Sequence, residues 1–441
     1  MLSVTLGLMV SMLLPYFFEV ITMMSILTPM LMINLYKTNM YMEDMIFCAN
    51  MMNNPLIFMT LTLTFLIILS SWSIKSDYYN TLLLILTLMV IFCFSSGNLL
   101  FFYIMFESSL VPILLMILGW GYQPERLQAG LYMIMYTVFG SMPLMIIILW
   151  AYINHSSLNM YMLLLMLNSP PSMFVSLALL AFLVKLPIYV VHVWLPKAHV
   201  EAPLGGSMIL AGVLLKLGGY GLYVYGNLWS WANTNSMTIG VICLALWGGL
   251  CASLICLSQS DIKAMIAYSS IVHMSLVVVG TISSTTWGDS CALVTMVAHG
   301  WVSSGLFLLA YITYESVGSR SFNYTKGILS LYPTLGFMWF VLASVNMAVP
   351  PTINLVGELA AVPIAFLLNI FLLVVLMAVL FMSVAYNMNL YTKVNHGAPS
   401  MMILSGKGCS CRGFIALVGH LMPLLLVVSL ELMSPYTEFC M

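Results

Sequence analysis

Charged residues are scarce in this sequence, and their scarcity excludes whole classes of protein. Of the 441 residues, 6% are Asp, Glu, Lys or Arg. A soluble domain carries roughly a quarter, because it must cover its surface against water. An ordinary soluble protein is therefore excluded. The formal net charge of −1 also excludes the basic surface with which proteins bind nucleic acid, so we expect no nucleic-acid partner.

Sequence motifs for metals and redox cofactors are also absent. Most of the nine cysteines are scattered, and several lie in apolar runs, where a thiol packs as a small hydrophobic side chain. Cys409 and Cys411 form the only close pair, without a neighbouring His or a second pair, which argues against a metal site. No nucleotide, flavin or iron–sulfur motif is present. We therefore expect no cofactor in this chain and no redox chemistry carried out by it alone.

One short stretch, VHVWLPKAHVEAPLGGS, resembles a metal triad at first sight. His192, His199 and Glu201 lie close together in it. Pro196 and Pro203 prevent these side chains from sharing one helical face, because proline interrupts a helix. We therefore expect no zinc site here.

Apolar runs make up most of the sequence, which is 62% hydrophobic. A helix needs about 20 apolar residues to cross a hydrocarbon core roughly 30 Å thick. Lipid offers backbone groups no partner, so such runs must be helical. The N-terminal run has no basic region or cleavage motif and is expected to remain as a span.

We predict an all-α polytopic membrane protein with about 14 transmembrane helices and no separate soluble domain. The predicted spans are residues 2–18, 20–36, 56–73, 79–96, 98–119, 128–152, 173–195, 204–229, 237–258, 262–283, 290–315, 328–366, 367–392 and 413–433, with 158–167 as a loop or interfacial segment.

Basic residues are distributed unequally between the two sets of loops. Loops that follow odd-numbered spans hold nine of the twelve Lys and Arg residues, and loops that follow even-numbered spans hold only Lys37. Lys185 and Lys216 lie inside spans. This split predicts one positively charged face, with both termini on the opposite side of the membrane. The nine residues are Lys75, Arg126, Lys197, Lys263, Arg320, Lys326, Lys393, Lys407 and Arg412.

Two of the predicted spans contain prolines that should interrupt them. Pro187 lies in span seven, and Pro350 and Pro351 lie in span twelve. Proline removes a backbone donor and clashes with the preceding turn. Broken helices at corresponding positions of two halves are typical of inverted-repeat transporters. Spans four to eight and nine to thirteen would form two inverted repeats of five helices each. The predicted units are the N-terminal transmembrane helices in residues 1–96, the two repeats in residues 79–229 and 237–392, and the C-terminal helix and tail in residues 413–441.

Three charged side chains lie deep in the first predicted repeat. Glu107 lies mid-span, where a carboxylate costs about 2.5–3.5 kcal/mol. Lys185 is about ten residues, or roughly 15 Å, from either end of its span, beyond the reach of its stem. Lys216 is equally central. One carboxylate and two amines can form an ion pair plus a spare amine that exchanges a proton. A structural hydrogen bond to a neighbouring helix is the alternative for Glu107.

Three further ionisable residues lie in the second predicted repeat. His273 and His299 occupy spans ten and eleven. Histidine titrates near pH 6.5 and can relay a proton without holding a fixed charge, but a histidine on an apolar helix is also common as a packed core residue. Both interpretations stay open. Glu358 follows the second predicted break and could receive the proton there, or it could be an interfacial carboxylate satisfied by open backbone.

The stretch VKLPIYVVHVWLPKAHVEAPLGGSMILAGVLLKLGGYG closely resembles the antiporter-like membrane-arm subunits of respiratory complex I. The similarity continues through YQPERLQAG, SQSDIKAMIAYSSIVHMSLV, AHGWVSSGLF and NMAVPPTINLVGEL. It covers residues 95–365 approximately, and the segments outside match only in hydropathy. With glutamate at position 358, the sequence resembles the chain 4 group of this family, because the sister chains usually carry lysine at that position.

The resemblance implies roles for the six buried residues. Glu107 would pair with Lys185 on the first broken helix, and Lys216 would lead towards a central water-filled axis. His273 and His299 would carry the proton along that axis. Glu358 would lie in the second half-channel.

The resemblance also implies a location and partners. The positive face would be the mitochondrial matrix side of the inner membrane, with both termini in the intermembrane space. Partners would be lipids and other membrane-arm subunits of complex I, including neighbouring antiporter-like chains. NADH, FMN, iron–sulfur clusters and ubiquinone would bind to other subunits. The resemblance thus implies a proton-translocating subunit of complex I, driven by NADH-to-quinone electron transfer in the other subunits. The alternatives are a cation/proton antiporter subunit without a redox partner and a structural membrane-arm subunit.

Overall fold

The computed structural model describes residues 2–13, 17–35, 52–71, 76–165, 172–229, 235–399 and 408–425. Within these ranges the chain is almost entirely helical and contains no β-strand, as predicted. Three of the expected basic loop residues, Lys37, Lys75 and Lys407, lie outside the described residues. The end of the last predicted span, beyond residue 425, lies outside them too.

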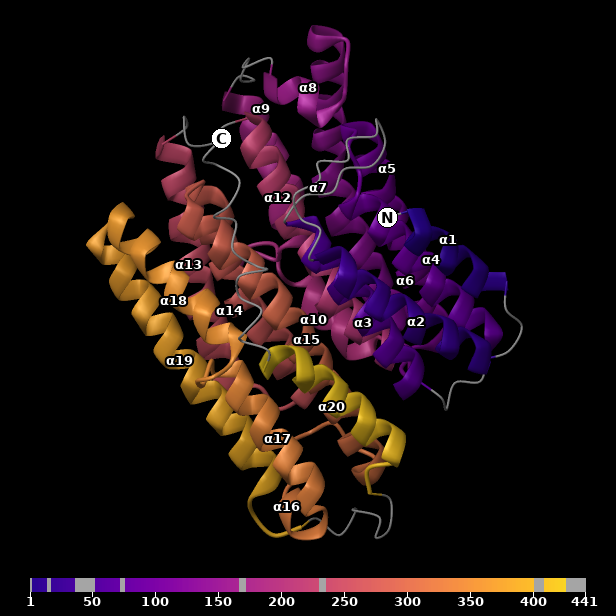
Figure 1. Ribbon diagram of the computed structural model, residues 1–441. Coiled ribbons are helices and arrows are strands. Elements are labelled where there is room, and N and C mark those ends of the chain that lie inside the picture. The colour runs from indigo at the N-terminus through magenta and orange to yellow at the C-terminus, as the bar shows by residue number, and fades with distance from the viewer. Residues whose placement is uncertain are drawn as a thin grey trace.

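The helices follow the predicted spans closely, and Figure 1 shows the N-terminal helices (indigo) at the right and α17 to α19 (orange) at the lower left. The first half contains α1 (Leu2–Leu13), α2 (Phe17–Leu35), α3 (Asn53–Ser70), α4 (Asp77–Phe94), α5 (Leu99–Ser108), α6 (Leu110–Trp120), α7 (Arg126–His155), α8 (Met160–Leu165), α9 (Ser172–Lys185), α10 (Trp194–Glu201), α11 (Leu204–Ile209), a π-helical turn (Leu210–Leu214) and α12 (Leu215–Trp229). The second half contains α13 (Asn235–Ser258), α14 (Ile262–Ser283), α15 (Thr286–Val317), α16 (Ile328–Leu331), α17 (Pro333–Asn346), α18 (Ile353–Leu368), α19 (Ile370–Asn395) and α20 (Cys411–Leu425).

Among the described residues, nine helices are long and apolar enough to cross a membrane. They correspond to predicted spans three to six, eight to eleven and thirteen, with α5 and α6 counted as one and α11 to α12 as another. The five remaining spans contain shorter apolar helices. Two of these five are the spans with predicted breaks, and the other three adjoin residues outside the described ranges. The chain is therefore a multi-pass membrane protein.

Both predicted helix breaks are confirmed. Helix α9 ends at Lys185, two residues before Pro187, and the chain becomes helical again at Trp194. Helix α17 ends at Asn346, and Ala348 adopts a left-handed conformation with φ of 58° before α18 begins. In both places the missing amide and the bulk of the proline ring stop the helix.

Two further interruptions were not predicted. Helices α5 and α6 are divided at Ser109, which keeps helical backbone angles, so Glu107 lies mid-span as predicted but beside a one-residue interruption. Pro112 explains this break, because its ring conflicts with the carbonyl four residues earlier, at Ser108. The π-helical turn Leu210–Leu214 lies directly before α12, which carries Lys216. Such turns insert one residue and are frequent at functional sites.

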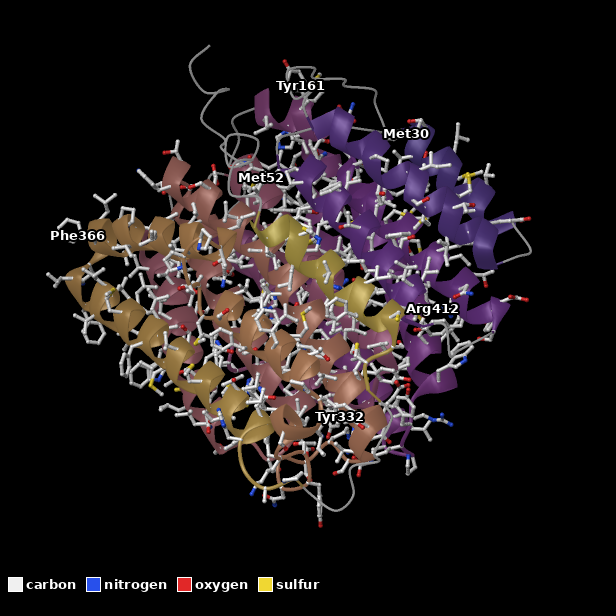
Figure 2. The ribbon with its side chains drawn as sticks, turned by 60° about the horizontal axis from the view of Figure 1, so that its bottom comes forward. Met30, Met52, Tyr161, Tyr332, Phe366 and Arg412 are labelled. Atoms are coloured by element: carbon white, nitrogen blue, oxygen red, sulfur yellow. The ribbon has the colours of Figure 1, made fainter. Side chains whose placement is uncertain are left out.

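The core of the molecule is formed by α11 to α12, α14 and α15. The most apolar stretches of these spans are 94%, 94% and 100% buried, against 39% for both α7 and α19. Figure 1 shows α14 and α15 in the centre, and α20 crosses in front of α15, against which it packs. Large apolar side chains project from the periphery, for example Phe366, which is 63% exposed (Figure 2). The buried helices therefore lie inside a wall that can face lipid.

The basic loops that the structure describes gather at one face. Arg320, which follows α15, donates to the carbonyl of Val200 at 2.8 Å. Lys263 donates to the carbonyl of Ala202 at 3.2 Å. Lys393, at the end of α19, lies 5.2 Å from the ring centre of Phe322. Loops after predicted spans seven, nine, eleven and thirteen are thereby tied together, as the distribution of Lys and Arg predicts.

Candidate functional site

Lys216 is fully buried and is held by two partners. It lies on α12 two residues after the π-helical segment, and its ammonium contacts the carbonyl of Ala211 within that segment. Its Nζ also lies 2.9 Å from Nδ1 of His299 on α15. The two helices thus place an amine and an imidazole in hydrogen-bond contact inside the core.

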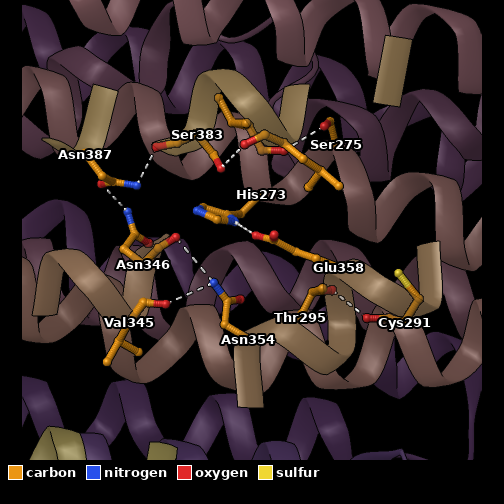
Figure 3. A network of polar contacts seen from close by, with 12 residues as sticks. His273, Ser275, Cys291, Thr295, Val345, Asn346, Asn354, Glu358, Ser383 and Asn387 are labelled. Atoms are coloured by element: carbon orange, nitrogen blue, oxygen red, sulfur yellow. Dashed lines mark hydrogen bonds and ion pairs between the residues drawn. The ribbon is translucent and has the colours of Figure 1, made fainter. Parts of the chain in front are cut away.

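The contacts continue from His299 to Glu358. The rings of His299 and His273 have centroids 5.4 Å apart and planes inclined by 44°. Nδ1 of His273 then lies 3.9 Å from Oε1 of Glu358, the pair seen in Figure 3. Lys216, His299, His273 and Glu358 come from α12, α15, α14 and α18, and none is more than 7% exposed. Four of the six predicted residues therefore form one continuous buried line, which we call the central chain.

Lys185 has a different set of contacts from those expected. Its Nζ donates to the carbonyl of Phe106 at 2.8 Å and lies 3.3 Å from the centre of the Phe106 ring. No ion pair joins it to Glu107, although the two opposite charges still attract one another. Oε1 of Glu107 is buried and has no hydrogen-bond partner. The lysine therefore reaches the Phe106 carbonyl and not the Glu107 carboxylate.

His199 is a candidate that its sequence pattern did not single out beyond the apparent metal triad. It is fully buried, and neither ring nitrogen has a hydrogen-bond partner. The ring stacks on Phe307 of α15, with centroids 4.7 Å apart and planes inclined by 9°. His192 instead contacts the carbonyl of Tyr189 and stacks on that ring. Across the ranges described, no group of three His, Cys, Asp or Glu side chains is placed to hold a metal.

An ion pair lies just beyond His199 at the basic face. Glu201, at the end of α10, lies 3.8 Å from Nη1 of Arg320. Burial raises the pKa of the Glu201 carboxyl above its ordinary value, and the Arg320 guanidinium acts in the opposite direction. The loop face therefore carries a carboxyl group whose protonation is balanced between these two effects.

Three buried asparagines around His273 were also missed. Asn346, Asn354 and Asn387 surround the second helix break and are hydrogen-bonded to one another or to backbone (Figure 3). Asparagine carries no charge, so a search for ionisable residues in apolar runs passes over it. The signal that could have found them is the position of Asn346 and Asn354 on either side of Pro350 and Pro351.

Comparison with known proteins decides the family. The model of the family "NADH:quinone oxidoreductase/Mrp antiporter, TM" matches residues 96–384. NADH-ubiquinone oxidoreductase chain 4 of Albinaria caerulea is 45% identical over 382 residues, covering 86% of this chain and 87% of the relative. The chain belongs to the NADH-ubiquinone oxidoreductase chain 4 family. The predicted resemblance is confirmed, and the aligned length exceeds the range 95–365 expected from the motifs.

Solved structures agree with the fold of the chain 4 family. A chain of respiratory complex I from Thermus thermophilus with bound NADH superposes with a TM-score of 0.85 at 22% identity, covering 96% of this chain and 95% of that chain. A chain of the Mrp complex from Dietzia sp. DQ12-45-1b gives a TM-score of 0.88 at 16% identity, covering 98% and 95%. At such identities the likeness concerns the fold alone. It confirms the all-α, polytopic architecture.

Proposed function

We propose that this chain is a proton-translocating membrane subunit of respiratory complex I. The observation that carries the proposal is the central chain, from Lys216 through His299 and His273 to Glu358. Ionisable side chains inside a membrane are costly, and those that persist usually serve ion or proton pathways. Four of them in sequence, three on the most buried helices and the fourth on α18, offer protons a path that packing alone does not require.

The chemistry of the path follows from its members. Lys216 can give a proton to Nδ1 of His299, because the two nitrogens are in contact and the hydrogen between them can be bonded to either one. An imidazole accepts a proton at one nitrogen and releases it from the other, so His299 and His273 can pass it along. Glu358, in the second turn of α18, accepts it from His273, which lies 3.9 Å from its Oε1.

Lys185 and Glu107 would set the charge at the start of the path. Lys185 is held by the Phe106 carbonyl and attracted by Glu107. A movement that changes the distance between the two charges would change how strongly Lys185 keeps its proton.

Proton uptake would occur at the basic face. Glu201 is paired with Arg320 there, and the buried His199 feels the charges of both Lys263 and Lys216. His199 therefore lies between the loop face and the beginning of the central chain. We assign this face to the mitochondrial matrix, with the protein in the inner membrane and both termini in the intermembrane space.

The driving energy would come from other subunits. The motifs for NADH, FMN, iron–sulfur clusters or ubiquinone are missing from this sequence, so electron transfer from NADH to quinone would take place in partner chains. Partners would be the other membrane-arm subunits, including neighbouring antiporter-like chains, together with lipid. A cation/proton antiporter subunit is the second candidate, favoured by the likeness to the Mrp complex. Co-purification of the chain with quinone-reducing subunits distinguishes the two.

Glu358→Gln tests the proposed function directly. The variant keeps the size of the side chain but cannot accept a proton, so we expect proton transport by the assembled complex to fall severalfold during NADH oxidation. The exposed Glu315 on α15 provides the matched control, since Glu315→Gln makes the same change away from the central chain. Unaltered proton transport and NADH oxidation in Glu358→Gln would contradict the proposal.

A further inference from the structure

The second helix break is closed by one asparagine. Helix α17 ends at Asn346, and backbone N–H groups of Met347, Ala348 and Val349 close its last turn on the carbonyls of Ala343, Val345 and Ser344. The side-chain Nδ2 of Asn354, in the first turn of α18, points back to the carbonyls of Val345 and Asn346 at 3.4 and 3.5 Å. Asn354 is 1% exposed, so these carbonyls have little access to water or lipid headgroups. The amide therefore spans the break and joins the two half-helices.

Two more asparagines join the break to α19 (Figure 3). Nδ2 of Asn346 donates to Oδ1 of Asn387 at 2.8 Å, and both residues are buried. Nδ2 of Asn387 donates in turn to the carbonyl of Ser383 at 2.9 Å. A hydrogen bond between two buried amides, anchored at one end to the backbone, restricts both side chains to one orientation.

The backbone carbonyl of Ser383 decides which way round the amides lie. A carbonyl can only accept, so Asn387 must present its NH₂ group to Ser383 and its oxygen to Asn346. Asn346 must then present its NH₂ group to Asn387, as observed. Oδ1 of Asn346 is left free of this chain of bonds. The orientation of both amide groups therefore follows from which groups can donate and which can only accept, and not from an arbitrary assignment of the amide nitrogen and oxygen.

The Asn346 side chain lies beside the His273 ring (Figure 3). Nδ1 of His273 faces Glu358. Nε2 is buried without a partner at hydrogen-bond distance, and it is the nitrogen left for the Asn346 oxygen. After a proton leaves Nδ1, an acceptor on that side stabilises the product tautomer, which carries its hydrogen on Nε2. Nδ1 then has the lone pair, and it faces the carboxylate.

We infer that Asn346 is a positioning residue that orients His273 for proton exchange with Glu358 at the second helix break. The inference rests on the proposed function. In the step, the N–H bond at Nδ1 of the His273 imidazolium breaks and an O–H bond forms at Oε1 of Glu358. The imidazole is left neutral with its hydrogen on Nε2, beside Asn346. An amide suits this place, because it adds an acceptor without adding a charge that would compete with Glu358 for the proton.

Asn346→Leu in the assembled complex tests the inference. Leucine is close to asparagine in size but offers no acceptor, so His273 loses its orientation. We expect proton-coupled turnover per assembled complex to fall about two- to tenfold, the factor that corresponds to one hydrogen bond of ordinary net strength. Thr295→Val is the matched control, because the buried Thr295 hydroxyl bonds only to carbonyls of its own helix. Asn346→Gln retains the amide and should recover part of the rate, which a purely structural role for Asn346 would not require.

Two comparisons keep the test decisive. If Asn346→Leu does not assemble, Asn387→Leu is measured instead, since it leaves Asn346 in place but removes the group that orients it. Normal turnover and proton transport in whichever variant assembles would overturn the inference. Glu358→Gln separates this outcome from failure of the proposed function. Impaired transport in Glu358→Gln with normal transport in the asparagine variant would reject the positioning role alone.

Discussion

A fully buried lysine needs partners for its ammonium group, and Lys216 has two of different kinds. The Ala211 carbonyl can only accept a hydrogen bond, whereas Nδ1 of His299 can also take the proton itself. An amine held only by carbonyls would be a structural device. In the proposed function, contact with an imidazole would let the same amine donate a proton, and this difference supports a role for Lys216 beyond packing.

Lys185 separates a functional from a structural interpretation of the buried charges. In Lys185→Met the contact with the Phe106 carbonyl is lost, but the apolar stem is retained. We expect lower proton transport per assembled complex, because the charge that Glu107 attracts is gone. The amount of complex on native gels and proton uptake by vesicles are measured together. A loss of assembly, with normal pumping by the complexes that remain, would instead favour a structural role.

Hydropathy is sufficient to select the six buried ionisable residues, because each is conspicuous in an apolar run. It cannot give their contacts, which depend on helices distant in sequence. The sequence therefore did not show that Lys185 contacts Phe106 rather than Glu107. Nor did the sequence single out His199 beyond the apparent metal triad, or indicate the uncharged Asn346. The roles of all six residues stay predictions.

At the scale of the helices, interruptions determine where polar groups collect. Both proline breaks were predictable, because a ring without an N–H donor ends a helix. Pro112 gave the same signal for the break at Ser109, but Pro143 lies inside the uninterrupted α7. Proline alone therefore does not distinguish a kinked from a broken helix. The π-helical turn before Lys216 carries no proline at all, and its existence depends on packing against α15 and α3.

Close packing of α12 against α9 holds the two buried lysines at a fixed separation. A Cβ atom at Gly221 would overlap the ring of Phe182. We expect Gly221→Val to destabilise the protein by about 1–3 kcal/mol, the usual cost of overpacking a core. The thermal midpoint and yield of the assembled complex measure this effect. Gly240→Val is the control, since nothing lies within 4 Å of that position, and equal stability of the two variants would contradict the packing account.

At the scale of the whole molecule, orientation in the membrane follows from the basic face. Cys411 is exposed at the start of α20, next to Arg412, and belongs to that face. In a chain in which Cys48, Cys243, Cys251, Cys409 and Cys440 are replaced by serine, a membrane-impermeant thiol reagent should label Cys411 only from the matrix side. Mitoplasts give the reagent access to the intermembrane-space side, and inverted vesicles give it access to the matrix side. Labelling in intact mitoplasts would reverse the proposed orientation.

The central claim is that protons cross through the buried line that begins at Lys216. The most direct measurement is proton transport by the purified complex carrying Lys216→Met in sealed vesicles, with NADH oxidation recorded at the same time. Methionine keeps the apolar stem but removes the proton donor to His299. The proposed path predicts severalfold slower proton transport in a complex that assembles fully. Unchanged proton transport and unchanged NADH oxidation in that complex would contradict it.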